Sequence, residues 1–224
     1  MISSDLAKVG GAVLLIVGAL LPVVNPLGDA PIFLAMTPGV DEALRAMLAR
    51  RIAVFSFALL LGSILFGGFV LRIFGLSIPV VQVAGGAVLF ALGWRLLADN
   101  PRPAALTPDP VEARQAALGR AFYPLTMPVS VDAGAISVAI TVGANHAHTL
   151  GRAVPQLVGA LVGSGLIAAS IFLTYRFAEP IGRRIGPTGM TVLVRLSAFI
   201  TLCIGVAIAW NGVRSLLGEI GIGA

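Results

Sequence analysis

Two carboxylates stand alone in long apolar stretches of this chain. Asp29 is the only charged residue between positions 9 and 40, and Asp132 is the only one between 121 and 151. A carboxylate at the centre of a membrane costs about 2.5–3.5 kcal/mol on insertion scales, so such residues are usually functional. Each could bind an ammonium group or take up and release a proton. In the simpler alternatives, either acid caps a helix or lies near water.

Helix-breaking residues surround both acids, in "NPLGDAPIFLAMT" (25–37) and "YPLTMPVSVDAGAIS" (123–137). Proline removes a backbone donor and clashes with the preceding turn, and glycine adds flexibility. Broken backbone is tolerated at membrane depth only where protein or a wet cavity surrounds it. New half-helix N-termini there would attract a carboxylate, and freed carbonyls would attract an ammonium group. The pattern therefore predicts a site for a small zwitterion.

The predicted binding residues are the helix breakers and the small or polar residues of these two stretches. They are Asn25, Pro26, Gly28, Asp29, Ala30, Pro31, Pro124, Thr126, Pro128, Ser130, Asp132, Gly134 and Ser137. Asp29 and Asp132 are also the candidates for coupling to an ion. Gln82 and Arg195, at similar places in two later helices, are secondary candidates, although Arg195 could simply snorkel to the membrane surface.

The elements that must position these residues are membrane-spanning helices. The mean hydropathy is +0.99 and only 11% of residues are charged, far below the quarter expected of a soluble domain. Five uncharged runs, each about long enough to cross the hydrocarbon core, lie at 9–28, 52–71, 73–94, 153–175 and 196–213. A sixth span is expected from 121–145. We therefore expect an all-α membrane protein with six transmembrane helices.

The basic residues divide unevenly between the two sides that six crossings would create. One side holds Lys8, Arg72, Arg152 and Arg214, and the other holds Arg45, Arg50, Arg51, Arg95, Arg102, Arg114, Arg120, Arg176, Arg183, Arg184 and Arg195. The positive-inside rule makes the second side cytoplasmic. The prediction is a multi-pass protein of the cell (inner) membrane, with both termini outside or in the periplasm.

The chain is expected to form two inverted three-helix repeats in one membrane domain. Residues 1–98 and 119–224 each hold three spans and one proline-broken helix, and 99–118 reads as a cytoplasmic linker rich in proline. Three helices per half force opposite orientations in the bilayer, a layout that many secondary transporters use. Asp41 is predicted to cap the helix that begins after it.

Other kinds of chemistry are not indicated. The net charge of +5 comes from scattered arginines without a basic stripe, so we expect no nucleic-acid partner. The spans hold no cluster of metal ligands, and the single Cys203 cannot form an intramolecular disulfide. No nucleotide loop, catalytic triad or paired-carboxylate signature is present. We expect no metal, no cofactor and no enzymatic activity.

Four segments resemble the MarC family of six-span inner-membrane proteins, which is grouped with lysine-exporter-like transporters. They are "NPLGDAPIFLAMT" (25–37), "FGLSIPVVQVAGGAVLFALGWRLL" (74–97), "PLTMPVSVDAGAIS" (124–137) and "VRLSAFITLCIGVAIAWNGV" (194–213). Some members are described as proton-driven transporters of small neutral amino acids, so the resemblance implies that activity. The prolines, Asn25, Gly28, Thr126, Gly134 and Ser137 match the family pattern. Asp132 stands in a motif that usually ends Gly-Pro-Gly, and many members have Arg at the position of Gln82.

The expected function is secondary transport of small neutral amino acids (glycine, alanine or serine) by alternating access, with a proton or another cation as the coupling ion. The alternatives are an exporter of another small solute or of a metal ion, and a membrane scaffold or intramembrane enzyme that does not transport. A scaffold would have no reason to break a helix in each half.

Overall fold

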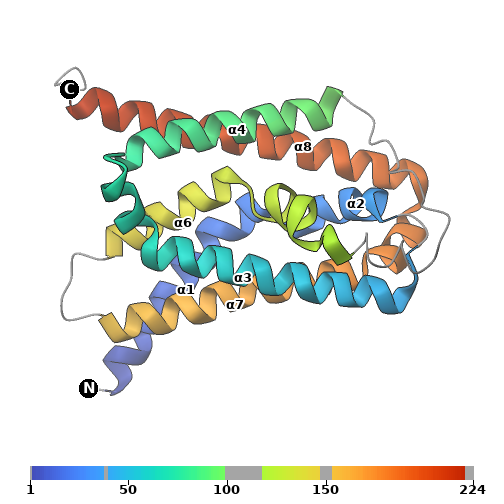
Figure 1. Cartoon of the computed structure of the whole chain (residues 1–224), viewed down its shortest axis with the longest axis horizontal. Coiled ribbons are helices and arrows are strands. Elements are labelled where there is room, and N and C mark those ends of the chain that lie inside the picture. Colours follow the sequence, from blue (N-terminus) through green and yellow to red (C-terminus); the bar gives the residue numbers. More distant parts are fainter. Residues whose placement is uncertain (1, 38–39, 99–117, 147–152, 220–224) are drawn as a thin grey trace.

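The structure, a computed structural model, describes residues 2–37, 40–98, 118–146 and 153–219 (Figure 1). Every described element is a helix, and none of the described residues forms a β-strand. The predicted all-α class is therefore confirmed. All but the last residue of the predicted linker 99–118 lies outside the described residues.

The first half of the chain forms one broken helix followed by two long ones. The elements are α1 (Ile2–Val24), α2 (Pro26–Met36), α3 (Glu42–Ile73) and α4 (Ile78–Ala98). α1 and α2 run one after the other toward the right-hand end of Figure 1, α3 returns, and α4 runs out again. The side chain of Asp41 accepts a hydrogen bond from the backbone N–H of Leu44 at 2.8 Å, so the predicted cap of α3 is confirmed.

The second half also opens on a broken helix. It contains η1 (Ala121–Ser130), a kinked helical segment in which Tyr123 and Met127 have extended backbone angles, and then α6 (Ala133–His146), α7 (Ala153–Arg176) and α8 (Ala178–Glu219). η1 and α6 run leftward in Figure 1, α7 runs back to the right, and α8 returns. α8 bends at Gly186, whose φ of 75° favours glycine. α1 therefore begins, and α8 ends, at the same end of the molecule (Figure 1).

Five helices of the described part are long and apolar enough to cross a membrane. They lie at Ala7–Leu34, Glu42–Ile73, Ile78–Ala98, Val154–Arg176 and Thr188–Gly218. The stretch 121–145 is divided between η1 and α6, whose apolar part, Ala133–Ala144, is shorter than a full span. The sixth crossing and the inverted repeat stay predictions.

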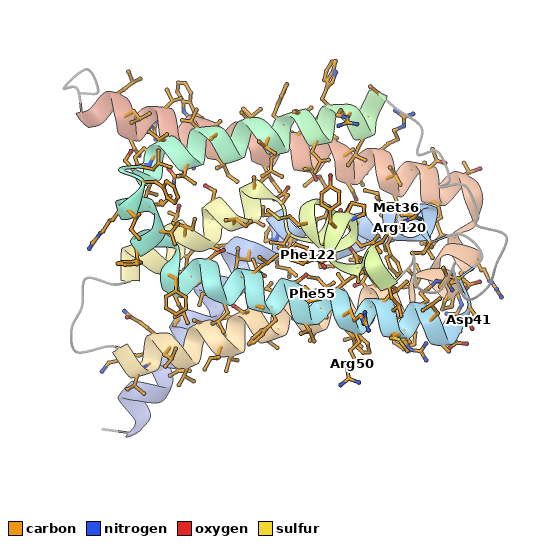
Figure 2. The ribbon with its side chains drawn as sticks, in the orientation of Figure 1. Met36, Asp41, Arg50, Phe55, Arg120 and Phe122 are labelled. Atoms are coloured by element: carbon orange, nitrogen blue, oxygen red, sulfur yellow. The ribbon has the colours of Figure 1, made fainter. Side chains whose placement is uncertain are left out.

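The helices pack around an apolar core that draws on α1, α2, α3, η1, α6, α7 and the first residue of α8. Phe55 of α3 and Phe122 of η1 point toward each other, with ring centroids 5.5 Å apart and the rings nearly perpendicular (Figure 2). Large apolar side chains such as Phe66, Trp94 and Trp210 lie exposed on the outside. An outer surface of this kind suits contact with lipid rather than with water.

Glycines allow the close approach of α4 and α8. A Cβ atom on Gly93 would lie 2.7 Å from the backbone nitrogen of Leu202, and one on Gly212 would lie 2.6 Å from the carbonyl oxygen of Pro79. Both distances are too short for a real Cβ contact, so only glycine fits. The two helices thus touch backbone to backbone, as small residues permit between membrane helices.

Candidate functional site

The first helix break is at Asn25, between α1 and α2. Its φ of 42° and ψ of 59° are left-handed, a conformation that asparagine tolerates better than most residues. Its side chain accepts a hydrogen bond from the backbone N–H of Gly28 at 3.3 Å. Pro26 takes the first helical position, where its missing N–H is not needed. Asn25 therefore ends α1 and caps the new N-terminus of α2.

The second break lies in and just after η1, where Tyr123 and Met127 precede prolines and have extended backbone angles. Proline cannot donate at positions 124 and 128, and hydroxyls take up backbone acceptors nearby: Thr126 donates to the carbonyl of Ala121 at 2.6 Å, and Ser130 donates to that of Leu125 at 2.8 Å. Pro124 follows a cis peptide bond. The predicted hydroxyls of Thr126 and Ser130 are therefore in the break, where they stabilise its backbone.

Asp132 caps α6 in the way that Asn25 caps α2. Its carboxylate accepts a hydrogen bond from the backbone N–H of Ala135 at 2.7 Å, and its side chain is buried. The capping alternative is therefore confirmed for Asp132 and wrong for Asp29, because the N-cap of α2 is Asn25. In both caps the side chain accepts a hydrogen bond from the backbone N–H three residues later in the chain.

Asp29 has a different setting. It lies half-buried in the first turn of α2, where the N-terminal end of the helix favours negative charge. Among the described residues, nothing forms a hydrogen bond or an ion pair with its carboxylate. A carboxylate without partners in an apolar interior is costly, so Asp29 is the acid best placed to accept a cation or a proton.

The two breaks lie together in the molecule. α2 contacts η1, and the carboxylate of Asp29 is close enough to that of Asp132 to interact with it electrostatically. α2 runs from its break toward the right-hand side of Figure 1, the side on which η1 also lies. The structure brings together Asn25, Asp29, Ser130 and Asp132.

Sequence reasoning missed Tyr175 and Phe33, which pack beside the breaks. Both side chains are fully buried, and their rings are stacked 4.4 Å apart. The hydroxyl of Tyr175 lies 2.8 Å from that of Ser130, and the ring is near enough to Asp29 for an electrostatic interaction. The available signal was a phenol at the last position of the uncharged run 153–175.

The glycines of the predicted site are packing positions. A Cβ atom on Gly28 would collide with the side chain of Ser197 on α8, and one on Gly134 would collide with Leu89 on α4. Ser137 is fully buried, and its hydroxyl has no hydrogen-bond partner. The Ser137 side chain packs against Gly85 of α4.

The remaining predicted residues lie around these. Pro26, Ala30 and Pro31 are buried in α2, Pro124 is half-buried in η1, and the side chain of Pro128 falls outside the described part. Gln82 of α4 donates to the hydroxyl of Thr141 on α6 at 3.2 Å. Arg195 lies half-buried on α8, the helix that packs against α2.

The chain is similar to known membrane proteins over almost its whole length. Residues 10–217 match a family described as "MarC family integral membrane protein". The UPF0056 inner membrane protein MarC of Citrobacter koseri is 30% identical over 221 residues, which cover 95% of this chain and 97% of that protein. The UPF0056 membrane protein YvbG of Bacillus subtilis is 27% identical over 199 residues, which cover 88% and 92%. No solved structure matches the chain.

These matches agree with the helical spans of the structure and with the motifs around both breaks. The family match includes both broken helices and the glycine contacts between α4 and α8. The chain belongs to the MarC family of integral membrane proteins.

Proposed function

We propose that this protein is a secondary transporter of small neutral amino acids, coupled to a proton. The observation that carries the proposal is the meeting of two helix breaks around a carboxylate that has no partner among the described residues. α2 and α6 leave their breaks in opposite directions (Figure 1). Two half-helix N-termini therefore begin near one another, in the layout that transporters use to bind substrates at the membrane midplane.

The contacts between helices support the proposed inverted repeat of residues 1–98 and 119–224. In such a repeat α1 and α2 correspond to η1 and α6, α3 corresponds to α7, and α4 corresponds to α8. α2 packs on α8 while α6 packs on α4, and α1 packs on α7 while η1 packs on α3. Each contact thus has its counterpart after exchange of the two halves. Alternating access needs two such halves that can rock about a shared site.

The sequence of the last helix in each half supports the same repeat. "GAVLFALGWR" (86–95) and "GVAIAWNGVR" (205–214) share two glycines and an arginine at the same spacing. This alignment pairs Pro79 with Ala198. The contact of Gly93 with Ala198 is then the counterpart of the contact of Gly212 with Pro79. Gly86 and Gly205, which are paired by the same alignment, also touch one another.

The predicted site residues favour a small zwitterionic substrate. The half-helix N-termini at Pro26 and Ala133 suit a carboxylate. The carboxylate of Asp29 suits an ammonium group or a proton. The residues predicted in the two broken segments are mostly small and include no lysine or arginine, so a second anionic group would find no partner among them. Arg195 of α8 is only a secondary candidate. Glycine, alanine and serine fit these conditions.

Asp29 is the proposed coupling residue, because Asp132 already holds the end of α6. Protonation of Asp29 would remove the repulsion between the two carboxylates and the cost of holding a charge in a half-buried position. A proton that binds in one state and leaves in the other can drive the substrate against its gradient. Six crossings in the cell (inner) membrane, with both termini outside, complete the proposal.

Purified protein in proteoliposomes tests this function. Labelled alanine should enter faster than into empty liposomes, and a pH gradient of one polarity should raise the uptake further. Unlabelled glycine, alanine and serine should compete, and leucine and lysine should compete less. A protein that takes up none of these under either polarity would instead fit a non-transporting scaffold.

A further inference from the structure

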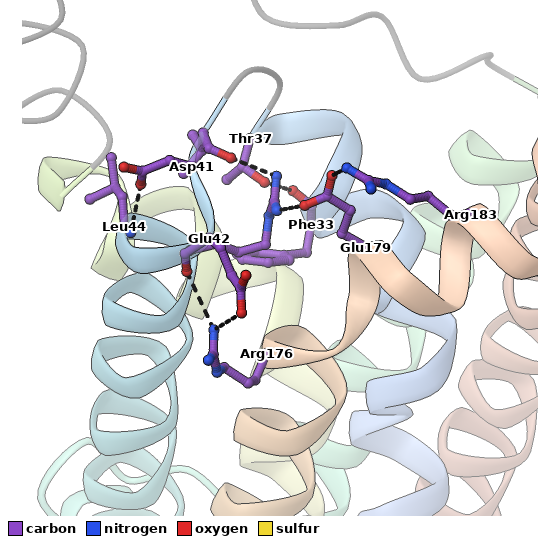
Figure 3. A network of polar contacts seen from close by, with 10 residues as sticks. Phe33, Thr37, Asp41, Glu42, Leu44, Arg176, Glu179 and Arg183 are labelled. Carbon is purple, nitrogen blue, oxygen red and sulfur yellow. Dashed lines mark hydrogen bonds and ion pairs between the residues drawn. The ribbon is translucent and has the colours of Figure 1, made fainter.

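A network of charged residues joins the two halves at the end of the molecule where α2 ends (Figure 3). Arg45 of α3 pairs with Glu179 at the start of α8, and Arg183 pairs with the same carboxylate. Beside them, Arg176 of α7 pairs with Glu42 of α3 at 3.2 Å. α3 thus supplies one arginine and one glutamate, and each of them pairs with an oppositely charged residue of α7 or α8.

Arg45 is the residue on which this network depends. Its side chain is only 8% exposed, whereas that of Glu42 is 80% exposed. It donates to Glu179 and, at 2.8 Å, to the backbone carbonyl of Val40. A buried guanidinium needs its counter-ion far more than an exposed pair does, so the loss of Glu179 would leave an uncompensated charge. The hydrogen bond from Arg183 and the charge of Arg45 hold the pKa of Glu179 below its usual value.

Directly below this network lies a second layer of contacts. Arg176 follows Tyr175, whose ring stacks on Phe33 of α2 and whose hydroxyl contacts Ser130 of η1. Thr37, at the end of α2, donates to the carbonyl of Phe33 at 2.7 Å. The stack therefore ties both broken helices to α7, between the helix breaks and the charged network.

The segment of α8 that carries Glu179 and Arg183 ends in a hinge at Gly186. α8 bends at Gly186, where a left-handed φ of 75° separates Ala178–Ile185 from the membrane-spanning part. A side chain at this position would meet nothing within 4 Å, so glycine is required by the backbone angle and not by packing. Such a position can absorb a change in direction.

We propose that these two layers are a gate, closed in this structure, between the helix breaks and the end of the molecule that carries Arg45. The outer layer is the pair of links Arg45–Glu179 and Glu42–Arg176, and the inner layer is the stack of Phe33 on Tyr175. Opening requires the start of α8 to swing away from α3. The gate rests on the proposed transport function, because only a transporter needs to open one end at a time.

The test is the rate at which a cysteine beside the breaks reacts with a water-soluble maleimide in nanodiscs. The reporter is Ser197→Cys in a Cys203→Ala background, since the side chain of Ser197 lies against Gly28 and is nearly buried. Glu179→Gln should raise the rate. If an open state of about 1% rises to about 10%, labelling becomes about tenfold faster. Arg184→Gln is the matched control, because this exposed arginine on the same segment forms no ion pair with any described residue.

Variants of the two layers separate a gate from a general loss of packing. Arg45→Gln combined with Glu179→Gln should label no faster than Glu179→Gln alone, since both changes break one contact. Tyr175→Phe should add a further increase, because it removes only the contact with Ser130. Rates equal to the parent in both Glu179→Gln and Tyr175→Phe would overturn the gate, as would an equal increase in Arg184→Gln.

The same protein distinguishes failure of the gate from failure of the proposed function. Glu42→Cys and Arg176→Cys, joined by a bismaleimide crosslinker that thiols can cleave, should stop alanine uptake in proteoliposomes, and cleavage should restore it. Uptake that persists in the crosslinked protein contradicts the gate and leaves the transporter. Faster labelling in Glu179→Gln, with no alanine uptake by the parent or any variant, would support the opening motion and contradict the transport function.

Discussion

Asp29 is the residue on which proton coupling should depend. Among the described residues nothing forms a hydrogen bond or an ion pair with its carboxylate, so replacing it with an amide breaks no described contact. Asp29→Asn should therefore abolish the stimulation of alanine uptake by a pH gradient while the protein stays inserted and folded. Exchange of labelled for unlabelled alanine, which needs no net proton movement, should continue. Both rates can be measured in the same proteoliposomes.

The matched change at the other acid is Asp132→Asn. An asparagine can still accept the hydrogen bond from Ala135, so this variant should keep both the cap and gradient-driven uptake. Normal stimulation in Asp29→Asn, or its loss only in Asp132→Asn, would show that Asp29 is not the coupling residue.

Asn25 should matter for stability through its backbone as well as its side chain. Asn25→Ala loses the cap on Gly28, worth ~1 kcal/mol, and forces alanine into a left-handed conformation, for ~1 kcal/mol more. Asn25→Gly accepts that conformation and should cost a few tenths of a kcal/mol. Thermal unfolding in detergent compares them. Equal unfolding temperatures for the alanine and glycine variants would contradict the left-handed cap.

The sequence could place both breaks and both acids, because lone charges and prolines stand out in an apolar chain. It could not say which polar residue of the first motif caps the helix. Asn25 and Asp29 are both good caps, and the choice depends on where the backbone turns left-handed, which only packing fixes. Tyr175 was missed for a related reason, since an isolated phenol carries no motif.

The close packing of α4 against α8 explains why glycine occupies the positions where these two helices touch. At Gly86 a Cβ atom would stand 2.5 Å from the backbone nitrogen of Ala209, so Gly86→Ala must push the two helices apart. Overpacking of this kind costs about 1–3 kcal/mol. The thermal unfolding temperature in detergent should fall.

The control for this change is Gly62 in the middle of α3, where an added Cβ atom meets nothing within 4 Å. Alanine is the better helix former by about 1 kcal/mol, so Gly62→Ala should leave the unfolding temperature equal or higher. A variant Gly86→Ala as stable as Gly62→Ala would contradict the close contact of α4 and α8.

Hydrophobic runs predicted the long helices well, because crossing a membrane demands some twenty apolar residues in sequence. They could not predict the form of 121–145. The residues before its two prolines have extended backbone angles that kink η1, and the hydroxyls of Thr126 and Ser130 donate to carbonyls of the kinked segment. Composition alone does not distinguish such a segment from one straight helix. The bend at Gly186 was likewise hidden, since glycine is common in membrane helices.

For the whole molecule, the distribution of basic residues predicts the orientation in the membrane. The end that carries the Arg45 network should be cytoplasmic, and the end where α1 begins and α8 ends should face outward (Figure 1). Cysteines introduced at Ser4 and Ser215 should react with an impermeant reagent added to intact cells, and one at Ala105 should not. Reaction at Ala105 would reverse the orientation.

The proposed repeat is a feature of the whole molecule that the sequence indicated only in part. The two breaks and their lone acids suggested it, but the acids are not equivalent, because Asp132 corresponds in its role to Asn25. The equivalent glycines of α4 and α8 are plain only once the contacts between those helices are known. Small residues recur in every membrane helix, so their spacing carries little information by itself.

We propose that this protein moves small neutral amino acids together with protons. Such transport carries net charge, so protein adsorbed on a solid-supported membrane should give a current when the amino acid is added without a pH gradient. We expect a current with glycine, alanine and serine, a smaller current or none with leucine and lysine, and no current in Asp29→Asn. No current with any amino acid, together with no uptake of labelled alanine, would contradict it.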